Sequence, residues 1–568
     1  MLRASRLAVP LLLLCLPGCA TYQAPAPATP APAAAAKPNA RTAVLLAIND
    51  VYRVEGVDGG TVGALARVRT LRQQLEREHP DLLMLHAGDL LFPSFLSRTF
   101  NGEQMIDVLN DLDGAPDGFD ERMFAVFGNH EFDKDKMKDA AMLNSRIAQS
   151  DFRWVNGNVV FAEGPDGRPV IAGENLARTW LVESGGIRIG LFGLTVDVKK
   201  PQYSTAFQDP IATARELTAA LRRQGAEVVV ALTHLNARDD RRLLATLGAD
   251  GPDLIIGGHD HEHMACDVGG RKLFKADADA RTATVATLTL GADGKLKVDY
   301  RLEPLDAKVA KDCAVDGDAQ SWLSLHEGLF CGQEAGKNGT PLEPRCLEKE
   351  LGSSKTRLEA EENKIRGSET NFGDWIADRM VEAFASCGAQ AAFVNSGSLR
   401  LNQDVPAGPL TRRTIEELFA YPSPLSLLRI KGSTLQQVAA RAIAGWPGSG
   451  NWLQISGFSF THDTAGGKVS DVSLVTPGGS RPVQPDEDVL VATVDYLFDP
   501  SGDRDGYTML DPSQVVGSCA VNGKDLKSDI VVPALQNATG GIDPRTDGRI
   551  RQVPPKTDVD PCAGAPVP

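Results

Sequence analysis

Residues 127–133 read Phe-Gly-Asn-His-Glu-Phe-Asp, and residues 257–261 read Gly-Gly-His-Asp-His. Each stretch follows a short apolar run, at 123–127 and at 254–256. Short apolar runs bounded by glycine are typical of buried strands. In open α/β sheets, ligands gather at the carboxyl ends of the strands. The two stretches therefore predict an α/β domain whose chemistry lies at one edge of its sheets.

Three further apolar runs end in the same types of residue. Asn49 and Asp50 follow the run 43–48, Asp89 follows the run 82–85, and His234 follows the run 228–232. Another apolar run lies at 187–194, and amphipathic stretches at 63–78 and 135–149 lie between the runs. This alternation is typical of a layered α/β domain. We expect the five polar strand ends to form one cluster of Asp, Asn and His side chains.

Such a cluster is suited to metal ions. Carboxylate oxygens with imidazole nitrogens, and no thiolate, favour divalent ions such as Zn, Mn, Co or Mg. Two ions about 3.5 to 4 Å apart activate a bridging hydroxide and neutralise the charge of a phosphoryl group. The expected cofactor is therefore a pair of divalent metal ions, and the expected chemistry is phosphoester hydrolysis.

The composition limits the other possibilities. The chain has 568 residues, of which 42% are hydrophobic and 23% are charged, so several globular domains are expected. Its net charge of -15 argues against a protein that wraps the phosphate backbone of a nucleic acid polymer. The expected partner is a small molecule that is held by local positive charge.

The alternation of strand and helix patterns ends near residue 305, where an irregular segment begins. We expect a catalytic domain over 41–305, an irregular connector over 306–357 with a helix around 319–329, a second α/β domain over 358–548 and a Pro-rich tail over 549–568. Cys313, Cys331 and Cys346 crowd the connector, which predicts one local disulfide in an oxidising compartment.

The N-terminus has the pattern of an export signal. Arg3 and Arg6 precede the apolar run 7–16, which is too short to span a bilayer, and residues 17–20 read Pro-Gly-Cys-Ala. This pattern resembles the signal peptide of a bacterial lipoprotein, in which residues 1–18 are removed and Cys19 is lipidated. Residues 19–40 would then form an Ala/Pro-rich tether.

The localisation follows from the same pattern. Ala20 after the lipidated cysteine resembles lipoproteins sorted to the outer membrane, facing the periplasm or the surface. A secretory peptide cut elsewhere is the alternative, and both interpretations predict a protein outside the cytoplasm.

Five stretches of this chain resemble, in their residues and their order, the conserved motifs of the metallophosphoesterase superfamily, and within it the two-domain 5'-nucleotidase and UDP-sugar hydrolase family. They are residues 49–50, 88–89, 128–133, 233–234 and 258–261. The resemblance implies a four-layer αββα catalytic domain followed by a smaller α/β substrate-binding domain. It also implies hydrolysis of nucleoside 5'-monophosphates to nucleoside and phosphate by a metal-bridging hydroxide, for nucleotide salvage outside the cytoplasm. A 2',3'-cyclic nucleotide phosphodiesterase or a UDP-sugar hydrolase with the same site stays an alternative, as does a lipoprotein that binds nucleotides without turnover.

The resemblance also assigns roles in the first domain. Asp89 would bridge the two metals, Asp50 and His261 would complete one site, and Asn129, His234 and His259 would complete the other. His130 would stabilise the transition state or protonate the leaving oxygen, oriented by Asp133. The family usually has His where this chain has Tyr52. Whether Tyr52 is a ligand or a packed aromatic stays open, and activity is expected to depend on added metal.

In the second domain the resemblance indicates a nucleotide pocket. Arg366, Asn395 and Arg400 would contact the nucleotide, and Tyr421 and Tyr496 would clamp the base. The ribose partner is Asp503 or Asp505, and Asp505 keeps the Gly and aromatic residue that follow it in the family.

Overall fold

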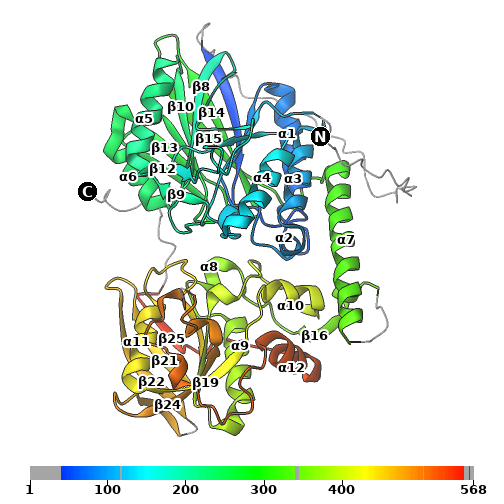
Figure 1. Ribbon diagram of the computed structural model, residues 1–568, viewed down its shortest axis with the longest axis vertical. Helices are drawn as coiled ribbons and strands as arrows, with labels where there is room; N and C mark the ends of the chain where they lie inside the picture. The colour runs from blue at the N-terminus through cyan, green and yellow to red at the C-terminus, as the bar shows by residue number, and fades with distance from the viewer. Residues whose placement is uncertain are drawn as a thin grey trace.

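The computed structural model describes residues 40–115, 118–338, 344–476, 478–502 and 504–555, together with Cys562. The expected signal peptide, Cys19, Asp503, all of the tether except Ala40 and most of the tail therefore lie outside the described residues. Among the described helices, none is both long and apolar enough to cross a bilayer. Figure 1 shows two α/β units, one above the other, with the long helix α7 running beside them.

The first unit contains two mixed sheets that pack face to face. One sheet has the strand order β15 (Leu296–Pro304), β14 (Thr282–Leu290), β1 (Arg41–Ile48), β2 (Leu83–His86), β3 (Met123–Val126), β4 (Arg153–Val155) and β6 (Leu176–Ala177). The other has the order β12 (Met264–Val268), β13 (Arg271–Lys275), β11 (Leu254–Gly257), β10 (Val228–His234), β8 (Ile187–Thr195) and β7 (Thr179–Ser184). Strands β1 to β4 are parallel neighbours, as are β8, β10 and β11.

Side chains along each strand point alternately to the two faces of the sheet, and each face packs against a different layer. Leu45 and Leu85 of one sheet pack against Leu232 of the other in a core between the sheets. The opposite face of the first sheet packs on α1 (Leu65–Glu78), α3 (Glu103–Asn110) and α4 (Ala140–Gln149), with α2 (Phe95–Phe100) nearby. The opposite face of the second sheet packs on α5 (Pro210–Arg223) and α6 (Ala237–Leu247). The expected αββα arrangement is confirmed.

The connector contains one long helix, α7 (Cys313–Asn338), which extends beyond the expected 319–329 at both ends. It contacts α1, α2 and α3 of the first unit, and Trp322 Nε1 donates a hydrogen bond to Asp107 Oδ2 at 2.9 Å. The expected local disulfide joins Cys331 to Cys346. Two more disulfides join Cys387 to Cys519 and Cys266 to Cys562.

The second unit is a smaller α/β domain, as expected. One of its sheets has the strand order β19 (Leu425–Lys431), β24 (Asp488–Val494), β17 (Ala391–Asn395) and β20 (Leu453–Ser456). Another has the order β23 (Gly479–Pro482), β22 (Lys468–Thr476), β21 (Phe458–Asp463) and β25 (Ile550–Val553). A third pair is β16 (Glu350–Ser354) with β18 (Gly408–Thr411). The helices are α8 (Glu362–Ile365), α9 (Asn371–Ala383), α10 (Arg412–Leu418), α11 (Gly432–Ala442) and α12 (Val532–Asn537). The stretch expected as a tail thus begins with strand β25, which pairs with β21.

Polar contacts join the two units at the carboxyl edge of the first-unit sheets. Arg53 pairs with Glu417 at 2.5 Å and donates to the carbonyl oxygen of Leu401 at 2.7 Å. Asn402 Nδ2 donates to Asp279 Oδ2 at 3.1 Å. The second unit therefore covers the edge at which the predicted metal ligands lie.

Candidate active site

The predicted ligands gather because their strands are neighbours. Residues after β1, β2 and β3 meet at one sheet edge, and residues after β10 and β11 meet them from the other sheet. Four of these residues have positive φ angles, which cost energy for residues other than glycine: Asp50, Asp89, His259 and His261. Backbone strain of this kind concentrates at functional sites.

Glycines beside the ligands permit the close approach. A Cβ on Gly88, whose φ is +88°, would lie 2.5 Å from His234 Nδ1. A Cβ on Gly128 would lie only 2.1 Å from Asp89 Oδ1. Any larger residue would push these two ligands out of place, which explains why glycine precedes Asp89 and Asn129.

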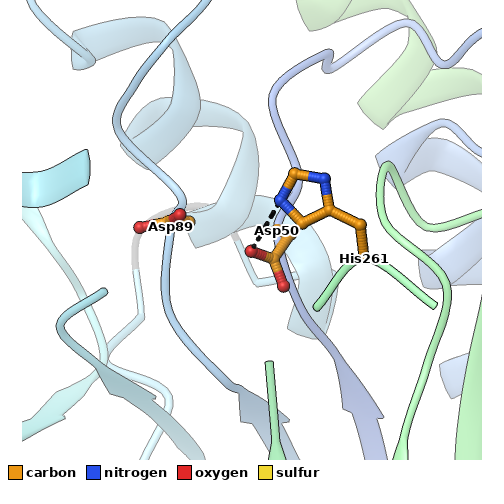
Figure 2. A group of neighbouring side chains, drawn as sticks. All are labelled: Asp50, Asp89 and His261. Carbon is orange, nitrogen blue, oxygen red and sulfur yellow. Dashed lines mark ion pairs between the residues drawn. The ribbon is translucent and has the colours of Figure 1, made fainter. Parts of the chain in front are cut away.

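Asp50, Asp89 and His261 form the first half of the cluster (Figure 2). One ligand atom from each lies within 4.8 Å of the others. His261 Nε2 lies 3.3 Å from Asp50 Oδ1, the ion pair that is dashed in Figure 2. Both carboxylates are buried, and a cation between them would compensate for their desolvation.

His234, His259 and Asn129 form the second half. His234 Nε2 faces Asp89 Oδ2 at 3.2 Å, and His259 Nδ1 lies 3.0 Å from Asn129 Oδ1. His234 Nδ1 bonds the carbonyl oxygen of Ala87 at 2.8 Å, which leaves Nε2 directed into the cluster. Within the described residues, this buried Nε2 has no hydrogen bond of acceptable geometry. An orphaned imidazole nitrogen beside two carboxylates fits a divalent metal site.

Tyr52 is buried among the same groups. Its hydroxyl lies 2.9 Å from His261 Nε2, 3.2 Å from Asp89 Oδ2 and 3.4 Å from Asp50 Oδ1. The phenol oxygen therefore lies among the atoms of the first half of the cluster. This placement is compatible with Tyr52 as a ligand and also with Tyr52 as a hydrogen-bonding neighbour of the ligands.

His130 and Asp133 pair as predicted. His130 Nδ1 lies 3.0 Å from Asp133 Oδ1, and the ring edge meets Tyr52 with the centroids 6.1 Å apart. Lys199, which sequence reasoning missed, pairs with Asp133 and lies 3.4 Å from His130 Nδ1. No local pattern identifies Lys199, because it follows Asp133 by 66 residues.

Glu131 is a second residue whose role was missed, although it lies within the decisive motif. Its buried carboxylate accepts the backbone N–H groups of Asp89, Leu90 and Leu91 at 3.0, 2.8 and 2.9 Å, and also that of Gly128. Glu131 thereby ties the loop after β2 to the loop after β3. It positions the ligands without facing the metal cluster.

The charges of the cluster change the proton affinities of its imidazoles. Burial lowers the pKa of His234, but the Asp89 and Asp50 carboxylates outweigh burial and raise it to about 9. Burial lowers the pKa of His130 to about 3, because the nearby Asp89 charge offsets the effect of burial only in part. The raised pKa of His234 reports a negative potential that also attracts divalent cations.

The predicted substrate residues fall into two groups. Asp505 accepts hydrogen bonds from Asn395 Nδ2 at 2.7 Å and from the Tyr496 hydroxyl at 2.9 Å. Arg400 and Tyr421 line a cleft together with His130, His261 and Tyr52. The rings of Tyr421 and Tyr496 are exposed, at 49% and 39%. This arrangement can hold an anionic ligand between the two units.

Arg366 is tied to the first unit through a residue that sequence reasoning missed. Glu362 pairs with Arg366 through one oxygen, and its other oxygen lies 2.9 Å from His261 Nδ1. The Nε of Arg366 is buried and has no hydrogen-bond partner among the described residues.

Comparisons with known proteins agree with this geometry. Residues 43–263 match the family described as calcineurin-like phosphoesterase, and residues 350–512 match the 5'-nucleotidase C-terminal domain. The chain is 26% identical over 505 residues to a 5'-nucleotidase of Vibrio vulnificus, covering 79% of this chain and 83% of that protein. The crystal structure of a 5'-nucleotidase precursor from Thermus thermophilus has the same fold, with a TM-score of 0.70 and 21% identity over 90% of this chain and 99% of that one.

A longer relative is a trifunctional nucleotide phosphoesterase of Bacillus subtilis. It is 24% identical over 527 residues, which are 86% of this chain. The chain spans 34% of the length of that protein.

Replacing Glu131 by Gln should destabilise the fold. The amide places an N–H₂ donor against backbone donors and removes the charge that they stabilise, so we expect a loss of about 2 to 4 kcal/mol in the free energy of unfolding. Chemical denaturation measures this free energy of unfolding. Glu121→Gln, a control at a side chain that is 66% exposed, should change stability by less than about 0.5 kcal/mol. Equal stability of both variants would contradict the bridging role of Glu131.

Proposed function

Because this chain belongs to the two-domain 5'-nucleotidase and UDP-sugar hydrolase family of metallophosphoesterases, we propose that it hydrolyses nucleoside 5'-monophosphates to nucleoside and phosphate. The chain is a hydrolase of this superfamily, and the superfamily uses a dimetal centre. The observation that carries the proposal is the cleft, in which His130 and the candidate metal ligand His261 of one domain lie across from Arg400 and Tyr421 of the other.

In this proposal two groups of side chains hold the metals. Asp50 and His261 would hold one ion, Asn129, His234 and His259 would hold the other, and Asp89 would contribute to both. Two divalent ions bound there would activate a water molecule and neutralise phosphoryl charge. Zn, Mn, Co and Mg all suit this donor set.

The remaining residues bind and orient the substrate. Arg366 and Arg400 donate to the phosphate, Tyr421 and Tyr496 hold the base, and Asp505 accepts from the ribose. His130 stabilises the transition state or protonates the leaving oxygen through Nε2, and Asp133 accepts from Nδ1. This role needs the doubly protonated imidazole, so the negative charge of the bound substrate has to raise the pKa of His130 above its value in the cleft without substrate. Closure of the second domain over the cleft excludes water from the reaction.

Phosphate release tests the reaction. We expect the purified protein to release phosphate from AMP or UMP when Mn²⁺ or another divalent ion is added, and EDTA to abolish the release. Asp89→Asn keeps the shape of the side chain but removes its charge, and should lower the rate more than about 100-fold.

The substrate profile separates the alternatives. Preferential turnover of 2',3'-cyclic AMP or of UDP-glucose would assign the same site to a different ester. Absence of turnover with every metal, in folded protein that still binds nucleotide, would leave a nucleotide-binding protein.

Tyr52 determines how much metal the enzyme needs. Imidazole is a better ligand than neutral phenol, so Tyr52→His should lower the Mn²⁺ concentration for half-maximal activity about 10-fold. Tyr52→Phe keeps the ring and removes the hydroxyl, and should raise that concentration if the hydroxyl is a ligand. A Tyr52→His variant with the native metal requirement would show that position 52 does not limit metal binding.

We also propose that the protein is exported and anchored in the cell envelope through lipidated Cys19, where it would salvage nucleotides. The export pattern of residues 1–20 supports this proposal. Cys19→Ser removes the thiol that carries the lipid and should move the protein from the membrane fraction to the soluble fraction. Unchanged membrane association after cell fractionation would contradict the anchor.

A further inference from the structure

Glu362 is a carboxylate of the second domain that reaches the candidate metal centre of the first. It begins helix α8, which faces the first domain at the top of the lower unit in Figure 1. One of its oxygens lies 2.9 Å from His261 Nδ1, and the other pairs with Arg366. Its side chain is only 14% exposed. Glu362 thus joins a candidate metal ligand to a candidate phosphate-binding arginine.

The two nitrogens of His261 have opposite surroundings. Nε2 faces the cluster, 3.3 Å from Asp50 Oδ1, whereas Nδ1 faces Glu362. An imidazole that binds a metal through Nε2 carries its proton on Nδ1. A carboxylate that accepts this N–H fixes the tautomer and the ring orientation, and it makes the imidazole a stronger ligand.

His261 needs such support more than a ligand in a regular strand does. It lies in the loop after β11 at a φ of 61°, a strained backbone conformation. Its cluster also has Tyr52 where an imidazole would be a stronger ligand. The strength of this half of the metal centre therefore depends on how well the His261 ring is held.

We propose that Glu362 is a positioning residue for the metal centre, which the second domain inserts behind His261 when the cleft closes. This inference rests on the proposed dimetal function. Separation of the domains would remove the acceptor from Nδ1, so closure and metal binding at Asp50, Asp89 and His261 strengthen each other. Because such coupling is reciprocal, a bound metal favours the closed form to the same extent.

Metal binding without substrate tests the proposal. Full-length protein is stripped with a chelator and titrated with Mn²⁺, and free Mn²⁺ is followed by its electron paramagnetic resonance signal. Native protein should bind two ions. Glu362→Ala should weaken one of them about 10- to 100-fold and leave the other nearly unchanged. Glu362→Gln keeps an oxygen that accepts from Nδ1, so its loss should be smaller.

Glu417→Gln is the matched control. Glu417 is also a buried carboxylate of the second domain that pairs with the first, but its partner Arg53 is not a metal ligand. An equal loss of Mn²⁺ affinity in Glu417→Gln and Glu362→Ala would assign the effect to domain contact in general and overturn the proposal. Unchanged affinity for both ions in Glu362→Ala would also overturn it. Native protein that binds no Mn²⁺ would overturn the proposed function and this inference together.

Discussion

The burial of two carboxylates, Asp50 and Asp89, is the constraint on which the rest of the site depends. Both lie at the end of the sheet sandwich, and the ion pairs that the described residues make with them come from imidazoles. A buried charge is costly unless it is paired or coordinates a metal. The surrounding chain supplies this compensation through His234, His261 and backbone donors, and a divalent ion would complete it.

This constraint explains local features that would otherwise be unfavourable. Left-handed backbone at Asp50 and Asp89 turns both carboxylates inward, and Gly88 and Gly128 leave room for them. Glu131 then holds the two loops in register through four backbone N–H groups. The free energy stored in this strain is offset by the packing of the two sheets beneath it.

The second domain lines the cleft and contacts a candidate metal ligand of the first. Arg400 and Tyr421 face the cleft, and Glu362 reaches across it to His261. A site divided in this way is complete only when the two domains are in contact, so the orientation of His261 depends on a contact between domains.

The layered α/β fold and the cluster of Asp50, Asp89, Asn129, His234, His259 and His261 could be predicted from local patterns in the chain. Both follow from local signals, because strand periodicity sets the direction of side chains and parallel strands bring their carboxyl ends together. The contacts of Lys199, Glu131 and Glu362 and the full length of α7 became visible only in the folded chain. Lys199 and Glu362 act across distant segments or across the domain boundary, and contacts of that kind leave no periodic signal in the chain. Glu131 lies inside the motif, but its partners are backbone groups of another loop, which only the folded chain brings within hydrogen-bonding distance.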